Sequence, residues 1–134
     1  MSDGLVVVDA SCLVRILTSS DEVATTVKAS LRGKALYAPT LVDYEVTSAL
    51  RGLSRKRQEI EQAAGSYLRY LAAMPIRRES AQPLIVRVWS LRHNYTVYDA
   101  SYVALAEALD ATLVTCDEKF ERAGAARCPI ETIN

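Results

Sequence analysis

The stretch LVVVDAS, residues 5–11, places four consecutive apolar side chains directly before an aspartate. Three of the four are valines, and a short apolar run without polar alternation is typical of a strand buried on both faces of a parallel sheet. Asp9 and Ser11 stand where this strand ends, and a helical pattern follows them through Thr18. The stretch therefore predicts a central, buried strand with a carboxylate at its carboxyl end.

Short apolar runs and helical periods alternate along the rest of the chain. Further strands are expected at residues 35–38, 75–78, 111–115 and 129–133. Helices are expected from Ser19 to about Gly33, from Thr40, from Ser54 to about Ala73, over 81–93, from Thr96 to about Leu109, and from Asp117 to about Arg122.

Two of these helices carry a capping-box signal, Ser19 with Glu22 and Thr96 with Asp99. Strands that alternate with helices predict an α/β fold with right-handed crossovers. We expect a single domain over residues 1–134, with a central, mostly parallel sheet of four to five short strands flanked by helices.

Composition excludes several classes of protein. The chain of 134 residues has 16 basic and 16 acidic residues, so its net charge is zero and nucleic acid would have to bind a local patch. Three cysteines and one histidine, without a CxxC pair, match neither a disulfide framework nor a zinc site. The longest apolar runs, such as the five residues Tyr102–Ala106, are too short to span a membrane, and no secretory signal is visible, so a cytoplasmic protein without membrane attachment is expected.

Four acids stand at positions that suggest chemistry. Asp9 and Asp117 follow predicted strands, at the edge where parallel sheets form their sites. Glu45 and Asp99 lie on predicted helices with largely apolar neighbours, where a carboxylate is costly unless it is paired or bound to metal. No Lys or Arg near these acids in the sequence is evident as a partner, and converging carboxylates suit Mg²⁺ or Mn²⁺.

Each residue also has a structural interpretation. Asp9 and Asp117 could cap the helices that follow them, Asp99 could complete its capping box, and Glu45 could pair with an arginine. Ser11 and Thr115 could be ordinary turn residues. Cys12 and Cys116 are expected to be small core residues beside strand ends.

Taken together, four segments carry a resemblance. They are VVVDAS (residues 6–11), APTLVDYEV (38–46), TVYDASYVALA (96–106) and LVTCD (113–117). In order and spacing they resemble the acidic blocks of PIN-domain proteins, most closely the VapC-type toxin ribonucleases of type II toxin–antitoxin pairs.

The resemblance implies a Mg²⁺-dependent endoribonuclease, with Mn²⁺ as a possible substitute. It implies an acidic quartet of Asp9, Glu45, Asp99 and Asp117, with Asp9 and Asp99 as the direct metal ligands. Ser11 and Thr115 match the family's accessory hydroxyls. The implied partners are an RNA substrate and a cognate antitoxin protein, and a homodimer is expected. The antitoxin is expected to lay an amphipathic or extended segment in an apolar groove between the helices near residues 41–71, with a basic side chain reaching the acids.

Two basic clusters could contact RNA phosphates beside the acids. The first comprises Arg51, Arg55, Lys56 and Arg57, and the second comprises Arg77 and Arg78. The alternative is that the first cluster is a solvated helix end paired with acids such as Glu59 and Glu61.

Two other functions stay open at this point. A Mg²⁺-dependent phosphatase or phosphotransfer domain could use a similar parallel sheet, although such proteins usually place two acids near the first strand and a lysine late. A non-catalytic PIN-like interaction module is the other alternative, against which the four acids argue.

Overall fold

The computed structural model describes residues 4–134. Within them, the strands are β1 (Leu5–Val8), β2 (Ala35–Pro39), β3 (Ile76–Glu79), β4 (Thr112–Thr115) and β5 (Ile130–Thr132). They form one sheet in the order β3-β2-β1-β4-β5, and every neighbouring pair is parallel. The predicted α/β fold is confirmed, and the valine-rich stretch is the central strand.

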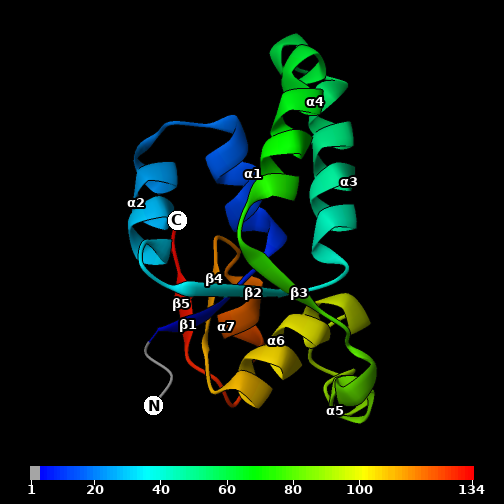
Figure 1. Cartoon of the computed structure of the whole chain (residues 1–134). Coiled ribbons are helices and arrows are strands. Elements are labelled where there is room, and N and C mark those ends of the chain that lie inside the picture. Colours follow the sequence, from blue (N-terminus) through cyan, green and yellow to red (C-terminus); the bar gives the residue numbers. More distant parts are fainter. Residues whose placement is uncertain (1–3) are drawn as a thin grey trace.

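Helices cover the sheet on both sides, as a parallel sheet requires. They are α1 (Ala10–Thr18), α2 (Glu22–Leu31), α3 (Val42–Ser54), α4 (Gln58–Ala73), α5 (Ile85–Ser90), α6 (Val97–Leu109) and α7 (Lys119–Ala123), with a 3₁₀ turn at Gln82–Leu84. Helices α1 to α4 lie to one side of the sheet, with α3 and α4 side by side, and α5 and α6 lie to the other (Figure 1). Among the described residues, no helix is long and apolar enough to cross a membrane.

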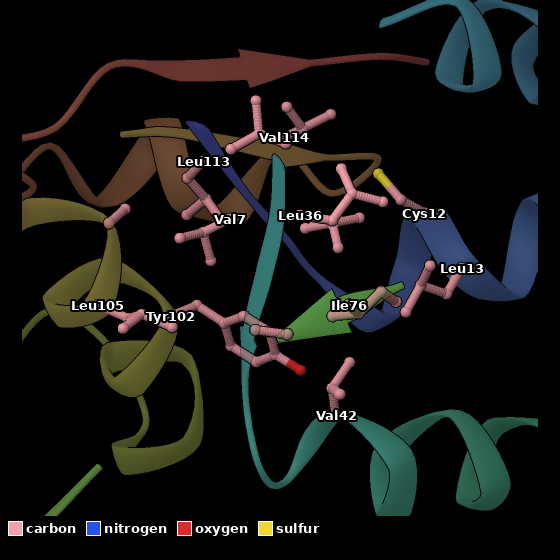
Figure 2. Packing of buried hydrophobic residues seen from close by; sticks show 14 of the residues in the cluster. Val7, Cys12, Leu13, Leu36, Val42, Ile76, Tyr102, Leu105, Leu113 and Val114 are labelled. Carbon is pink, nitrogen blue, oxygen red and sulfur yellow. The ribbon is translucent and has the colours of Figure 1, made fainter. Parts of the chain in front are cut away.

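The hydrophobic core is one buried cluster formed by side chains of both the sheet and the helices. Side chains from β1, β2 and β4 converge with side chains of α1, α3 and α6 in one buried cluster (Figure 2). Helix α6 is buried from Ala100 to Ala106, which explains why this segment of the sequence is almost entirely apolar. Because α6 is fixed against the sheet, the residues on its first turn are fixed relative to the ends of the strands.

Helix starts agree with the sequence in one of the two predicted capping boxes. The Thr96 hydroxyl accepts the amide of Asp99, as expected. Helix α2, however, is capped by Asp21, whose carboxylate accepts the amide of Ala24. The Ser19 hydroxyl accepts the Asp21 amide instead, so the cap lies two residues later than predicted.

Two further boundaries differ from the expectation. Ser54 does not cap α4 but ends α3, where its hydroxyl donates to the carbonyl of Arg51. The expected helix over 81–93 is a 3₁₀ turn followed by the short helix α5. Neither difference changes the sheet or the placement of the acids.

Arg78 ties β3 to the two long helices. Its guanidinium donates to both carboxylate oxygens of Asp43, on the first turn of α3, at 2.9 and 3.1 Å. It also donates to the carbonyls of Leu71, Met74 and Ile76 at 3.0 to 3.3 Å. Its side chain is only 21% exposed, so this arginine is part of the scaffold.

We predict that Arg78→Met lowers the free energy of unfolding by about 2 kcal/mol, because it removes five hydrogen bonds, two to Asp43 and three to backbone carbonyls. The neighbouring exposed Arg77, whose guanidinium lies 5.9 Å from the Tyr37 ring centre, is the matched control. Arg77→Met should change stability by less than about 0.5 kcal/mol. Urea unfolding of both variants tests this, and equal effects would contradict the scaffold role.

Candidate active site

Asp9 lies at the carboxyl end of β1 and is the N-cap of α1. Its Oδ1 accepts the Ser11 hydroxyl at 2.6 Å and the Cys12 amide at 3.2 Å, and its Oδ2 accepts the Thr115 hydroxyl at 2.7 Å. Thr115 reaches Asp9 because β1 and β4 are neighbours, with Val8 opposite Val114. The capping interpretation is therefore correct but incomplete, since two side-chain hydroxyls hold the same carboxylate.

Burial dominates the electrostatics of Asp9. The residue is only 5% exposed, and desolvation raises the pKa of its carboxyl, against the lowering effect of the three hydrogen bonds and of Lys119. The charged form is thus costly here, and a cation placed beside Asp9 would stabilise it.

Glu45 faces the same region from the first turn of α3. Its Oε1 accepts a 2.6 Å hydrogen bond from the hydroxyl of Tyr102, a residue 1% exposed on α6. Burial raises the pKa of Glu45, the Tyr102 bond opposes this, and the negative charges of Asp99 and Asp9 add to the increase. Among the residues that the structure describes, Glu45 forms no ion pair with an arginine.

Sequence reasoning missed Tyr102. The signal that could have found it is its position three residues after Asp99, which places both on one side of α6.

Asp99 and Asp117 share a cation that the sequence analysis overlooked. The ammonium of Lys119 lies 3.1 Å from Oδ2 of Asp99 and 3.5 Å from Oδ2 of Asp117. Burial disfavours the charged amine, but the carboxylates outweigh this effect and raise the pKa of Lys119. The expectation that no basic residue stands near the acids in the sequence is therefore wrong, because Lys119 is only two residues beyond Asp117.

All four acids line one cavity of about 920 Å³. Ser11 also lines it, whereas Thr115 is fully buried behind Asp9. Positions far apart in the sequence meet here because β1 and β4 are adjacent and because α3 and α6 both pass this edge of the sheet. The cavity also has basic lining residues, namely Arg15, Arg57, Lys119 and Arg122.

The basic clusters predicted from the sequence fall mostly outside this cavity. Arg57 lines it, and its guanidinium pairs with Glu59 at 2.8 Å. The other five predicted basic residues do not line the cavity: Arg51, Arg55, Lys56, Arg77 and Arg78. The guanidinium of Arg78 is bound instead by Asp43 and three carbonyls. Arg15 and Arg122 are lining residues that the sequence analysis did not single out.

The donor set suits a hard divalent cation, since carboxylates and hydroxyls dominate it. Within residues 4–134, however, no group of three or more His, Cys, Asp or Glu side chains is assembled as a metal-ligating cluster. The ammonium of Lys119 lies between two of the acids, so a cation is already attracted to this side of the cavity. Coordination by Asp99 would compete with that ion pair.

Known proteins resemble the chain over nearly its whole length. A model of the PIN domain matches residues 6–126. VapC ribonuclease Mb0985 of Mycobacterium bovis is 37% identical over 130 residues, which cover 96% of this chain and 98% of the relative. Ribonuclease VapC1 of Mycobacterium tuberculosis is 38% identical over 128 residues, which cover 95% of this chain and 96% of the relative.

Solved structures show the same fold. The crystal structure of PAE2754 from Pyrobaculum aerophilum has a TM-score of 0.69 and 26% identity, covering 94% of this chain and 82% of that one. VapC20 of Mycobacterium tuberculosis, described as a toxin that cleaves the sarcin–ricin loop, has a TM-score of 0.67 and 20% identity, covering 89% of this chain and 95% of that one. The four acidic blocks and the parallel sheet agree with the similarity to these relatives. The chain belongs to the PIN-domain family and, within it, to the VapC ribonucleases.

Proposed function

We propose that this protein is the toxin of a type II toxin–antitoxin pair and that it cleaves RNA with Mg²⁺ in the cavity around Asp9. The observation that carries the proposal is the state of Asp9. A carboxylate that is 5% exposed and held by three donors is fixed in orientation, at the base of a cavity shared with three further acids. Such a costly arrangement is typical of a functional site.

Each residue of the proposed site has a distinct role. Asp9 and Asp99 are the direct ligands of the cation, with Glu45 and Asp117 completing the acidic surroundings. Ser11 and Thr115 hold the carboxylate of Asp9, and Tyr102 holds that of Glu45. When bound, Mg²⁺ supplies polarisation of the phosphate, a bound water of lowered pKa and stabilisation of the leaving oxygen; Mn²⁺ suits the same ligands.

Basic residues around the rim support binding of RNA. Arg15, Arg57 and Arg122 line the cavity and carry the charge that phosphates need beside an acidic site. Lys119, once displaced from Asp99 and Asp117, reaches the same space. Of the two clusters predicted from the sequence, Arg57 is the member that the cavity lining supports.

The rival functions have less support. The curated relatives are ribonucleases at 37 to 38% identity over nearly their whole length, which favours RNA cleavage over a phosphatase or phosphotransfer reaction. Four acids in one cavity favour an enzyme over a non-catalytic interaction module.

An antitoxin partner follows from the same assignment. A solved VapBC2 complex from Rickettsia felis shares the fold at a TM-score of 0.69 and 16% identity, covering 97% of this chain and 99% of that one. For the partner's apolar segment we propose a second cavity of about 630 Å³ between α1, α2, β2 and α4, lined by Leu17, Leu31, Leu36, Tyr67, Tyr70 and Met74 among others. It overlaps only the end of the region 41–71 expected from the sequence. A homodimer stays part of the proposal.

The first prediction concerns activity. Purified protein should cleave single-stranded RNA with Mg²⁺ and not with EDTA, and Asp9→Asn should reduce the rate by more than about 100-fold, because it removes a proposed ligand. Asp110→Asn, at the exposed C-cap of α6, is the matched control and should retain activity.

Expression of the wild-type gene alone should stop growth of a bacterial host, whereas Asp9→Asn should not. RNA cleavage that persists in Asp9→Asn, or in EDTA, would contradict the proposed site.

The second prediction concerns pH. Because burial raises the pKa of Glu45, the folded state binds the proton more tightly than the unfolded state, and ionisation of Glu45 costs stability as pH rises. Glu45→Gln keeps an acceptor for the Tyr102 hydroxyl but removes the charge. In EDTA this variant should therefore raise the free energy of unfolding at pH 8 and leave it unchanged at a pH below 4.5, the ordinary pKa of glutamate.

Urea unfolding between pH 4 and pH 8 measures this difference, with the exposed Glu61→Gln as control. The same variant should lose Mg²⁺-dependent cleavage. A stability difference that does not vary with pH would show that the charge of Glu45 is not the cause.

The third prediction concerns Lys119. Since its ammonium pairs with two of the acids, Lys119→Met should let Mg²⁺ bind more readily, lowering the half-saturating concentration roughly fivefold, or about 1 kcal/mol. Thermal melts across a Mg²⁺ series measure this without an activity assay. Lys56→Met, on the exposed turn between α3 and α4, should leave the Mg²⁺ response unchanged. An unchanged response in Lys119→Met would rule out competition.

A further inference from the structure

Two cysteines meet beside the acidic cavity. The sulfur atoms of Cys12 and Cys116 lie 3.7 Å apart, and both are free thiols. Cys12 is on the first turn of α1 and fully buried, whereas Cys116 directly follows β4, is partly exposed and lines the cavity. They are 104 positions apart in the sequence, and the pairing of β1 with β4 brings them together.

Both cysteines are tied to the groups that hold Asp9. The Cys12 amide donates to Oδ1 of Asp9 at 3.2 Å. The Cys116 amide donates to the Ser11 hydroxyl at 3.0 Å, and that hydroxyl donates to the same Asp9 oxygen at 2.6 Å. A backbone shift at either cysteine would therefore reach Asp9 through one or two hydrogen bonds.

We propose that Cys12 and Cys116 form a redox-sensitive pair, which a hydroperoxide oxidises to a disulfide through Cys116. A disulfide has a sulfur–sulfur distance of about 2.05 Å, so the pair needs to close by about 1.7 Å from its present 3.7 Å. Rotation of two side chains with a small shift of the Cys116 segment supplies a movement of that size. The third cysteine, Cys128, interacts electrostatically with Glu107 on α6. It belongs neither to α1 nor to the segment that directly follows β4.

The reaction proceeds in two balanced steps. The Cys116 thiolate attacks one peroxide oxygen, an S–O bond forms, the O–O bond breaks, and the leaving alkoxide or hydroxide takes up a proton. The Cys12 sulfur then attacks the sulfur of the Cys116 sulfenic acid, the S–S bond forms, the S–O bond breaks, and the departing hydroxide takes the Cys12 proton to form water. Two thiols lose two electrons, the peroxide gains them, and an external dithiol reverses the change.

The order of the steps follows from exposure. A peroxide in the cavity can reach Cys116, which lines it, whereas Cys12 is shielded at 0% exposure. Cys12 is in contact with the Cys116 sulfur and is placed to resolve the sulfenic acid before it is oxidised further. Closing the disulfide moves the Cys116 segment relative to α1 and alters the hydrogen bond from its amide to Ser11, which disturbs the orientation of Asp9.

The test is oxidation of the purified full chain with a small excess of hydrogen peroxide, followed by intact mass and non-reducing peptide mapping. We expect a mass loss of two hydrogens and a peptide that joins Cys12 to Cys116, reversed by dithiothreitol. Cys128→Ser should behave as the wild type, whereas Cys116→Ser should form no intramolecular disulfide. Cys12→Ser should instead accumulate Cys116 sulfenic acid, trapped with dimedone.

A result in which Cys116 proceeds directly to sulfinic acid in the wild type, or in which either cysteine joins Cys128, would overturn the proposal. The pairing itself does not depend on the proposed function. Its consequence does, and we expect Mg²⁺-dependent RNA cleavage to fall at least tenfold on oxidation and to recover on reduction. If the disulfide forms and a cleavage activity present in the reduced protein does not change, the pair is no switch.

Discussion

The structure depends on a carboxylate that is almost completely buried. Asp9 terminates the central strand, caps α1 and accepts hydrogen bonds from residues on two different segments. Three donors stabilise its charge, yet burial still raises its pKa, so the arrangement is only partly compensated. The ends of β1 and β4 and the start of α1 converge on this group. Asp117 follows β4, and α3 and α6 bring Glu45 and Asp99 to the same cavity.

Charge balance in the cavity explains how four acids can stand together in a chain of zero net charge. The single positive charge of Lys119 offsets part of the negative charge of Asp99 and Asp117, whereas Glu45 relies on a neutral donor, Tyr102. On one side of the cavity, the ammonium of Lys119 already pairs with Asp99 and Asp117. On the other side, the pKa values of Asp9 and Glu45 are raised. A divalent cation that binds between these sides would stabilise the charged forms of Asp9 and Glu45 and would displace the ammonium of Lys119.

The parts of the fold that sequence could predict are those governed by local patterns. Apolar runs identified the strands, helical periods identified most helices, and acids at strand ends indicated the edge that carries the site. Capping was less predictable, because Ser19 and Asp21 are both good N-caps and the choice depends on tertiary packing. Lys119, Tyr102 and the Cys12–Cys116 contact were missed because each acquires its role from a partner that only the fold brings near. Arg78 shows the opposite case, since a basic side chain that suggested RNA was engaged by Asp43.

We propose that Asp9 and Asp99 hold one divalent cation and that Lys119 withdraws to admit it. Anomalous diffraction from crystals grown with Mn²⁺ tests it most directly. The account predicts a Mn²⁺ peak at about 2.1 Å from carboxylate oxygens of both aspartates, with the ammonium of Lys119 moved away from Asp99. A Mn²⁺ peak remote from Asp9, or an intact pair between Lys119 and Asp99 beside the bound ion, would contradict it.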